Sequence, residues 1–229
     1  MINLLRRKKK SLIDQVTISL SYYNDGDFLR NQIKAFSEYL GEINIQIIDD
    51  GSNSDPIENY LDDIPHCIAV YKILEDIPWN IPGVRNLGSM IASTPWILHL
   101  DMDHIIPKKS IDQISKLDLN KRGRFYSFNR QLKDITKFTA GTLLISIEDF
   151  WNCGGYDEEF VGAYGHNDPF LKKKLNIHGV NEIKLSNIWF EDHGSEASCL
   201  LPRNEISRNQ SLMNNKIKNR EFFSKNICF

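Results

Sequence analysis

The segment WILHLDMD, residues 96–103, joins five mostly apolar positions to two carboxylates that stand one residue apart. Short apolar runs of this kind are typical of buried strands, so Asp101 and Asp103 are expected at the carboxyl end of one. In open α/β sheets, ligands bind at that edge. Two adjacent carboxylates repel each other unless a cation or a proton lies between them. Since Mg²⁺ and Mn²⁺ prefer oxygen ligands and are often shared with substrate phosphates, the segment predicts a metal–diphosphate site.

Strand and helix patterns alternate on both sides of this segment. In the first half, strands are expected at residues 16–20, 43–48, 68–71 and 96–100, and helices at residues 28–40 and 82–92. The second half is more mixed, with strands at residues 125–128, 142–145 and 187–190 and helices at residues 147–151 and 168–177. The pattern predicts an α/β fold with a mostly parallel central sheet flanked by helices.

The composition is that of an ordinary globular protein. The 28 basic and 30 acidic residues give a net charge of −2, which offers no reason to expect nucleic acid as a partner. No stretch approaches 18 consecutive apolar residues, so no membrane span is predicted. The four cysteines are scattered without a C-x-x-C pair, which indicates free thiols in a reducing compartment. We therefore expect a cytoplasmic protein.

Both ends of the chain differ in composition from the middle. Residues 1–13 form a basic arm that contains RRKKK at residues 6–10. This run is either a solvated arm or a weak, peripheral attachment to anionic lipid at a membrane. Residues 203–229 form a polar tail, rich in Asn, Lys and Ser, that is able to form a helix. We expect a single domain at residues 14–202 between them. The sequence indicates no oligomeric state.

Common phosphate-binding loops are absent from the sequence. It contains neither G-x-x-x-x-G-K-[ST] nor a G-x-G-x-x-G after the first expected strand, which disfavours P-loop and dinucleotide-binding folds. If the chain binds phosphates, it must hold them in another way. A carboxylate-bound metal is the obvious candidate.

Six short elements, taken together, resemble the family 2 glycosyltransferases in order and spacing. They are VTISLSYYN at 16–24, IIDDGS at 47–52, RNLG at 85–88, LDMD at 100–103, GGYDE at 154–158 and YGHND at 164–168. The resemblance covers roughly residues 14–195 and implies the GT-A fold, an α/β domain that binds nucleotide sugars. There are departures: Ser21-Tyr22 replaces a usual Pro-Thr, Asn167 stands where Glu is usual, and an extra residue lies between Gly162 and Tyr164.

The resemblance assigns the donor side. It implies that Asp50 contacts the uracil or ribose, although DGS is also common turn chemistry. Ser21, Tyr23 and Asn24, at the end of the first strand, are expected to complete the nucleotide site. Asp101 is expected to face the ribose and sugar, or to reach the metal through water.

Arg85 is a second candidate for the donor side. It lies in the first turn of the helix that Pro82 opens. A guanidinium beside the positive end of a helix is suited to a diphosphate or a sugar. The alternative is a surface salt bridge.

The metal ligands follow from the same resemblance. Asp103 is expected to bind the metal directly. His193 is the candidate third ligand, since metal-dependent relatives carry a histidine at a similar late position, although a lone histidine is more often structural. His104 and His166 have weaker claims. Mn²⁺ or Mg²⁺ is the expected cofactor.

Catalytic and acceptor roles are expected in the two later elements. The resemblance implies that Asp168 is the base that removes the proton from the acceptor hydroxyl, although a carboxylate at a helix start is also a common N-cap. Asn167, Gly155 and Tyr156 are expected on the acceptor side. A change from Glu to Asn at residue 167 keeps hydrogen bonding but removes a charge, so acceptor preference is expected to shift.

The predicted function is a metal-dependent, inverting glycosyltransferase of the hexosyltransferase type. It would move a sugar from a nucleoside-diphosphate donor, a UDP-sugar above all, to a hydroxyl of a saccharide or glycolipid acceptor. Assembly of polysaccharide, lipopolysaccharide or glycoprotein would all fit. One alternative is an inactive sugar- or nucleotide-binding module. The other is a nucleotidyltransferase, which the acidic loop at residues 22–27 disfavours because a Gly-rich, basic loop is expected there.

Overall fold

A computed structural model describes residues 11–132, 135–194 and 203–223. The basic run at residues 6–10 lies outside the described residues. The strands are β1 Val16–Tyr22, β2 Asn44–Asp49, β3 Ala69–Lys72, β4 Trp96–Leu100, β5 His104–Ile105, β6 Arg124–Leu132, β7 Ile135–Ser146 and β8 Asn181–Asp192. The α-helices are α1 Gly26–Ser37, α2 Ile81–Ile91, α3 Lys108–Ile114, α4 Ile147–Asn152, α5 Asn167–Ile177 and α6 Arg203–Asn219. Three 3₁₀ turns are η1 Leu12–Asp14, η2 Ile57–Tyr60 and η3 Glu158–Phe160. No helix in these ranges is both long and apolar enough to cross a membrane.

One half of the sheet is parallel, as the alternating pattern predicts. The strands form a single sheet in the order β3-β2-β1-β4-β7-β6-β8-β5, and the first four are all parallel to one another. In the register, Tyr22 pairs with Asp49, and Leu20 with Leu100. The carboxyl ends of β1, β2 and β4 therefore lie side by side. This edge brings the segments at residues 21–24, 50–52 and 101–103 together.

The other half is mixed, so the prediction of a mostly parallel sheet is wrong. Strand β7 runs antiparallel to both β4 and β6, and β5 runs antiparallel to β8, whereas β6 and β8 are parallel. Only two residues separate β6 from β7. A connection of this length joins antiparallel neighbours, while a parallel pair needs a crossover of a dozen residues or more. The sequence pattern indicated two short strands here and missed the long hairpin.

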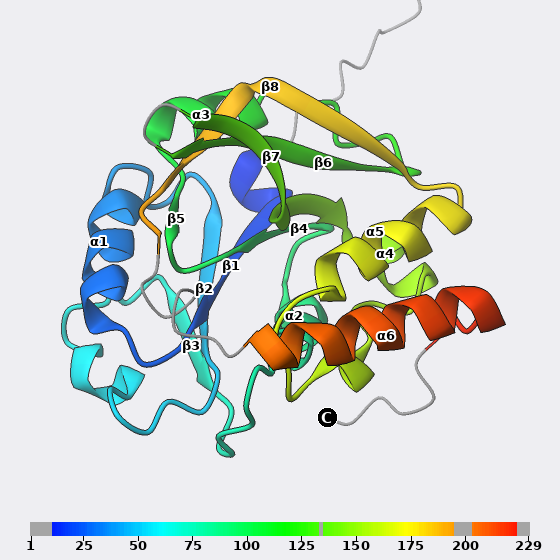
Figure 1. Cartoon of the computed structure of the whole chain (residues 1–229). Coiled ribbons are helices and arrows are strands. Elements are labelled where there is room, and N and C mark those ends of the chain that lie inside the picture. The colour runs from blue at the N-terminus through cyan, green and yellow to red at the C-terminus, as the bar shows by residue number, and fades with distance from the viewer. Residues whose placement is uncertain (1–10, 133–134, 195–202, 224–229) are drawn as a thin grey trace, which may run out of the picture.

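Helices cover both faces of the sheet (Figure 1). On one face, α1 and α3 pack against β1 and β4, and on the other, α4 and α5 pack against β4, β6 and β7. All seven residues of β1 and all five of β4 are buried. Strands covered on both faces read as continuous apolar runs, which explains the WILHL segment. Gly88 lets α2 approach the sheet, because a Cβ there would lie 2.4 Å from Ser19 Oγ.

Candidate functional site

A cavity of about 260 Å³ opens at the carboxyl edge of the parallel strands. Its walls come from five parts of the chain: the end of β1, the loop after β2, the start of α2, the turn after β4 and the segment that leads into α5. The lining residues are Ser21, Tyr22, Tyr23, Asp50, Trp79, Ile81, Pro82, Arg85, Asp101, Met102, Asp103, Phe160, Ala163, Tyr164, Gly165, Asn167 and Asp168. Most of the residues proposed from the sequence therefore share one cavity.

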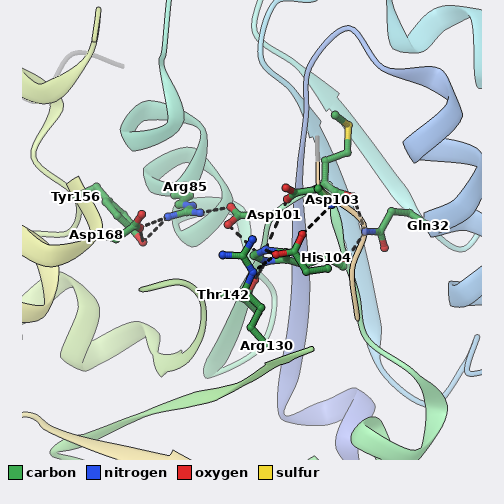
Figure 2. A network of polar contacts seen from close by, with 12 residues as sticks. Gln32, Arg85, Asp101, Asp103, His104, Arg130, Thr142, Tyr156 and Asp168 are labelled. Carbon is green, nitrogen blue, oxygen red and sulfur yellow. Dashed lines mark hydrogen bonds and ion pairs between the residues drawn. The ribbon is translucent and has the colours of Figure 1, made fainter. Parts of the chain in front are cut away.

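Arg85 lies at the centre of this site (Figure 2). It is 2% exposed, and its guanidinium forms ion pairs with Asp101 through one terminal nitrogen and with Asp168 through the other. The nitrogen that contacts Asp168 also donates to Tyr156 Oη at 2.7 Å. The surface salt bridge considered for Arg85 is thus not what the structure shows. The guanidinium joins two acids that are 67 residues apart in the sequence (168 − 101).

The surroundings of Arg85 fix the charges of the cluster. Burial opposes its charged form, but Asp168, Tyr156 and Asp101 outweigh burial and raise the pKa of the guanidinium well above its usual range. Burial likewise works against ionised Asp101, yet the Arg85 charge lowers the pKa of that carboxyl overall. Burial, with help from the Arg85 charge, holds the pKa of His99 well below its usual range. Arg85 and Asp101 are therefore held in their charged forms, with a neutral His99 behind them.

A group suited to a divalent cation lies beside Arg85. One ligand atom from each of Asp101, Asp103 and His104 falls within 4.8 Å of the others. His104 Nε2 lies 3.7 Å from Asp103 Oδ1, and Nδ1 lies 3.6 Å from Asp101 Oδ2. Burial lowers the pKa of His104 despite the two neighbouring carboxylates. A neutral imidazole is the form that binds metals.

Three side chains from other elements hold this turn and the His104 ring in place. Gln32, fully buried on α1, donates to the carbonyl oxygens of Met102 at 2.7 Å and His104 at 2.8 Å. Thr142 Oγ1, on β7, lies 2.7 Å from His104 Nδ1, and the imidazole stacks on Phe190 with ring centroids 4.2 Å apart. These contacts fix the ring orientation, as supporting hydrogen bonds commonly do at metal-binding histidines. The sequence favoured His193 over His104, whereas the structure places the His104 ring in the group that could hold a metal.

His193, the late histidine, lies close to this group but points elsewhere. Its backbone N–H donates to Asp103 O at 2.9 Å, whereas its imidazole is 43% exposed and lies 3.5 Å from Glu191 Oε2. The structure therefore brings His104, and not the His193 ring, into contact range of the acid pair. A role for His193 in metal binding stays a prediction.

Asp50, expected from the sequence to contact a nucleotide, lines the cavity, and its nucleotide-binding role stays a prediction. It is 4% exposed and accepts a hydrogen bond from Asn80 Nδ2 at 2.9 Å. Burial raises the pKa of its carboxyl to about 7, helped by the charge of Asp49 and opposed by the Asn80 bond. Ser21 and Tyr23 line the same cavity. Asn24 does not, because its Oδ1 accepts from Ser54 N and Asp55 N and so shapes the loop after β2.

Asp50→Asn is expected to remove a pH-dependent cost to stability. Wild-type Asp50 titrates near 3.8 when unfolded and near 7 when folded, so the native state holds the extra proton between these values. The free energy of unfolding therefore falls as the pH rises through this window, by at most about 1.4 kcal/mol per unit. Asparagine carries no charge and can still accept from Asn80.

The measurement is urea denaturation of both proteins at pH 5 and pH 8. The stability advantage of Asp50→Asn should be larger at pH 8, and an advantage that is the same at both values would contradict the argument. The exposed substitution Asp62→Asn is the matched control and should show no such trend.

Asp168 is a residue of the first turn of α5 rather than its cap. The helix begins at Asn167, and its N-cap is His166, in the left-handed region with φ of 66°. The capping alternative therefore does not hold for Asp168, whose carboxylate contacts Arg85 and Tyr156. Asn167 lines the cavity. Both residues therefore border the cavity, and their roles toward an acceptor stay predictions.

The other two residues expected on the acceptor side lie behind the cavity wall. Tyr156 is 1% exposed, and Gly155 is buried with φ of 57°. A Cβ at Gly155 would lie 2.8 Å from Asn86 Oδ1, so glycine is required there for close packing. Neither residue lines the cavity. Trp79 and Tyr164 do line it, with rings in an edge-to-face contact at 5.3 Å, and aromatic faces of this kind suit sugar rings.

Gly141, on β7, is a position of the candidate site that the sequence analysis missed. A Cβ there would lie 2.2 Å from Asp101 Oδ2 and 3.5 Å from the Arg85 terminal nitrogen. Only glycine leaves room for the Asp101 carboxylate at this place. An isolated glycine within a strand is a recognised sign of close approach, and it is the signal that could have identified the position.

Helix α6 holds the segment that forms one wall of the cavity. Asn209 is fully buried, and its Nδ2 donates to the carbonyl oxygens of Phe160 at 3.0 Å, Ala163 at 2.8 Å and Gly165 at 3.0 Å. About two helical turns further along α6, Lys216 Nζ lies 2.9 Å from both Asp157 Oδ2 and Glu159 Oε1. The helix therefore supports the cavity although it lies outside the six sequence elements.

Asn209→Ala is expected to destabilise the protein by about 1–3 kcal/mol, the usual cost of leaving buried polar groups unsatisfied. The loss should be accompanied by faster hydrogen exchange of the amides at residues 160–166, because the wall loses its three anchoring bonds. Urea denaturation and exchange mass spectrometry measure the two effects. Gln210→Ala, the neighbouring position, is the control. Equal effects from both variants would mean that the Asn209 hydrogen bonds have no special role in holding the cavity wall.

The mixed sheet, with helices on both faces and an acidic cavity at its edge, is an α/β architecture consistent with the GT-A fold. Residues 17–138 match the family described as Glycosyl transferase family 2, which is more than half of the sequence. The chain belongs to this family, which confirms the resemblance seen in the six elements. No curated protein sequence matches the chain.

Solved structures show the same fold at low sequence identity. The structure of S. aureus TarS has a TM-score of 0.67 and 12% identity, covering 90% of this chain and 40% of TarS. That of S. aureus TarS 1–349 has the same TM-score with 14% identity, covering 90% of this chain and 66% of that one. GalNAc-T7, solved with UDP, GalNAc and Mn²⁺, has a TM-score of 0.64 and 14% identity, covering 78% and 43%. The chain thus spans between 40% and 66% of the length of these proteins.

Proposed function

We propose that this protein is a metal-dependent, inverting glycosyltransferase. It takes a sugar from a nucleoside-diphosphate donor, a UDP-sugar, and transfers it to a saccharide or glycolipid hydroxyl. The observation that carries the proposal is that one cavity holds both an acid pair at a strand end, Asp101 and Asp103, and a separate carboxylate, Asp168, joined to the pair through Arg85. Membership of the family supports the reaction type. We propose a cytoplasmic location, with the basic arm in contact with anionic lipid.

The ligand atoms offered by Asp101, Asp103 and His104 suit a divalent cation. Two carboxylates and a neutral imidazole within 4.8 Å of one another offer oxygen and nitrogen ligands, a set that suits Mn²⁺ at least as well as Mg²⁺. Asp103 and His104 would bind the ion directly, and Asp101, held by Arg85, would bind it directly or through water. When bound, such an ion supplies positive charge to stabilise a departing diphosphate.

The remaining side chains divide between donor and acceptor. Asp50 and Tyr23 lie at the end suited to a base and ribose, with Asp50 able to accept hydrogen bonds from either. Trp79 and Tyr164 offer aromatic faces to a sugar ring. Asp168, near the start of α5, is placed to accept the proton of the acceptor hydroxyl as that oxygen attacks the sugar carbon from the side opposite the diphosphate. A single displacement of this kind inverts the configuration at the sugar carbon.

The first test is thermal melting with UDP, GDP and dTDP, each with Mn²⁺ and with EDTA. A ligand present at about 100 times its dissociation constant raises stability by roughly 2.7 kcal/mol. A shift with UDP and Mn²⁺, followed by release of UDP from a UDP-sugar, is the expected result. UDP binding without turnover on any sugar or acceptor would favour the inactive binding module. A melting shift with GDP or dTDP instead of UDP would mean that the donor carries that other nucleotide.

Removal of the metal ligand is expected to abolish the UDP shift. Asp103→Asn should bind UDP no better in Mn²⁺ than wild type does in EDTA, because the direct carboxylate ligand is lost. Isothermal titration with UDP and Mn²⁺ measures the effect. Asp112→Asn removes a carboxylate that is 49% exposed and paired with Lys108, and it should bind as wild type does. Retained Mn²⁺-dependent binding in Asp103→Asn would contradict the metal assignment.

A further inference from the structure

The Tyr156 ring is fixed rigidly behind the cavity. Its backbone N–H donates to Asn86 Oδ1 at 2.8 Å, and Asn86 Nδ2 donates back to Tyr156 O at 3.0 Å. The ring contacts His99 edge-to-face at 5.8 Å, and the Arg85 guanidinium lies 5.1 Å from its centroid. With 1% exposure, the ring has no room to swing toward a bound sugar. Its hydroxyl therefore acts on protein groups and not on substrate.

The hydroxyl completes a three-membered arrangement with Arg85 and Asp168 (Figure 2). Tyr156 Oη accepts a hydrogen bond from Arg85 at 2.7 Å and donates one to Asp168 Oδ1 at 2.9 Å. Burial raises the pKa of Tyr156 well above its usual range, more than Arg85 lowers it, so the hydroxyl keeps its proton. It is therefore a permanent donor to the carboxylate.

Both bonds that hold the Asp168 carboxylate end on the same oxygen. Arg85 and Tyr156 each donate to Oδ1, and within the described part of the chain no hydrogen bond is present at Oδ2. The χ2 torsion that rotates an Asp carboxylate is broad when nothing holds it. Two donors on one oxygen, one from Arg85 and one from Tyr156, restrict that rotation more than a single donor does. The cavity-lining position of Asp168 leaves Oδ2 for a ligand.

We propose that Tyr156 is a positioning residue, whose hydroxyl, together with Arg85, anchors Asp168 Oδ1 so that Oδ2 is presented to the acceptor hydroxyl. The inference rests on the proposed function of Asp168 as the base. The hydroxyl also stabilises the ionised carboxylate, since a donated hydrogen bond favours the charged form. The other charged or titratable groups that face this carboxylate are Arg85 from α2, Tyr164 from the preceding loop and, across the guanidinium, Asp101.

Tyr156→Phe is the decisive variant, because it removes only the hydroxyl. Tyr39→Phe is its matched control: Tyr39 is also 1% exposed, and its hydroxyl donates to Ile106 O at 3.2 Å, away from the cavity. The probe reaction is release of UDP from UDP-glucose, UDP-galactose, UDP-GlcNAc or UDP-GalNAc with Mn²⁺. In it a water oxygen bonds to the anomeric carbon, the bond from that carbon to the diphosphate oxygen breaks, and Asp168 takes the proton from water.

The expected result for Tyr156→Phe is a fall in kcat of about tenfold or more with little change in KM. The acidic limb of the kcat profile should move to higher pH by about one unit, and the UDP–Mn²⁺ melting shift should be unchanged. Tyr39→Phe should alter none of these. A merely structural role would lower stability in both variants while leaving the pH profile in place, and that outcome overturns the proposal.

A second measurement tests the role of Tyr156 even if UDP release is undetectable. Carbon-13 NMR of protein labelled at Asp carboxyls follows the acid titration of Asp168, assigned through its loss in Asp168→Asn. The titration midpoint should lie higher in Tyr156→Phe than in wild type, by about one pH unit, with no change in Tyr39→Phe. Identical midpoints overturn the positioning role. Absence of UDP binding and turnover, with a shifted midpoint, would instead overturn the proposed function alone.

Discussion

Asp168→Asn is expected to reduce the rate of sugar transfer by about 10²–10⁴-fold, the usual contribution of a positioned general base. Asparagine has nearly the same shape and can still accept from Arg85 and Tyr156 through its carbonyl oxygen. It cannot take a proton from an acceptor hydroxyl. The loss should therefore appear in kcat, while the affinity for UDP with Mn²⁺ stays within a few fold of wild type.

The measurement is UDP release by the variant across the panel of UDP-sugars, together with titration of UDP binding. Asp118→Asn, which removes a half-exposed carboxylate in a distant loop, is the matched control and should turn over normally. Turnover by Asp168→Asn close to the wild-type rate would show that another group takes the proton. A loss of UDP affinity as large as the loss of rate would place Asp168 on the donor side instead.

Arg85→Met is expected to have the largest effect on stability, a loss of about 3–5 kcal/mol in the free energy of unfolding. The guanidinium is 2% exposed and is the shared cation of Asp101 and Asp168, whose side chains are 27% and 20% exposed. Methionine fills much of the volume but leaves both carboxylates without a counter-charge in a mostly buried setting. Urea denaturation at neutral pH measures the loss.

The same argument predicts a rescue. Adding Asp101→Asn and Asp168→Asn to Arg85→Met removes the uncompensated charges and should restore much of the lost stability, since a buried ion pair as a whole is often close to neutral in its net contribution. Arg85→Lys keeps the positive charge but loses the planar guanidinium that contacts two acids. Its free energy of unfolding is therefore expected to lie between those of wild type and Arg85→Met. A loss below about 1 kcal/mol in Arg85→Met, or no rescue in the triple variant, would contradict the role of Arg85 as counter-charge.

The parallel half of the fold and the location of the cavity were predictable from the sequence. The runs that became β1, β2 and β4 have the composition of buried strands, and each is followed by polar residues. Parallel strands share one carboxyl edge, so a local pattern was enough to bring Asp50, Asp101 and Asp103 to it. The family could be identified for the same reason, because its elements are short and contiguous.

Other features depend on register and packing. The β6–β7 hairpin was missed because its strands do not alternate regularly and a two-residue connection was not visible as a turn. The choice of His104 over His193 as the ring nearest the acids depends on Thr142 and Phe190, which reach His104 from separate strands. No spacing rule relates these positions.

The sequence by itself therefore determined the fold class, the family and the edge of the sheet where the cavity lies, because these follow from periodicity and from the residues at strand ends. Only the tertiary structure decided how the site is arranged. Arg85 lies between Asp101 and Asp168, and the Tyr156 hydroxyl donates a hydrogen bond to the Asp168 carboxylate. Gly141 leaves space for the Asp101 side chain. These contacts join residues far apart in the chain, and their geometry arises from the packing of α2, α5 and β7 around one edge of the sheet.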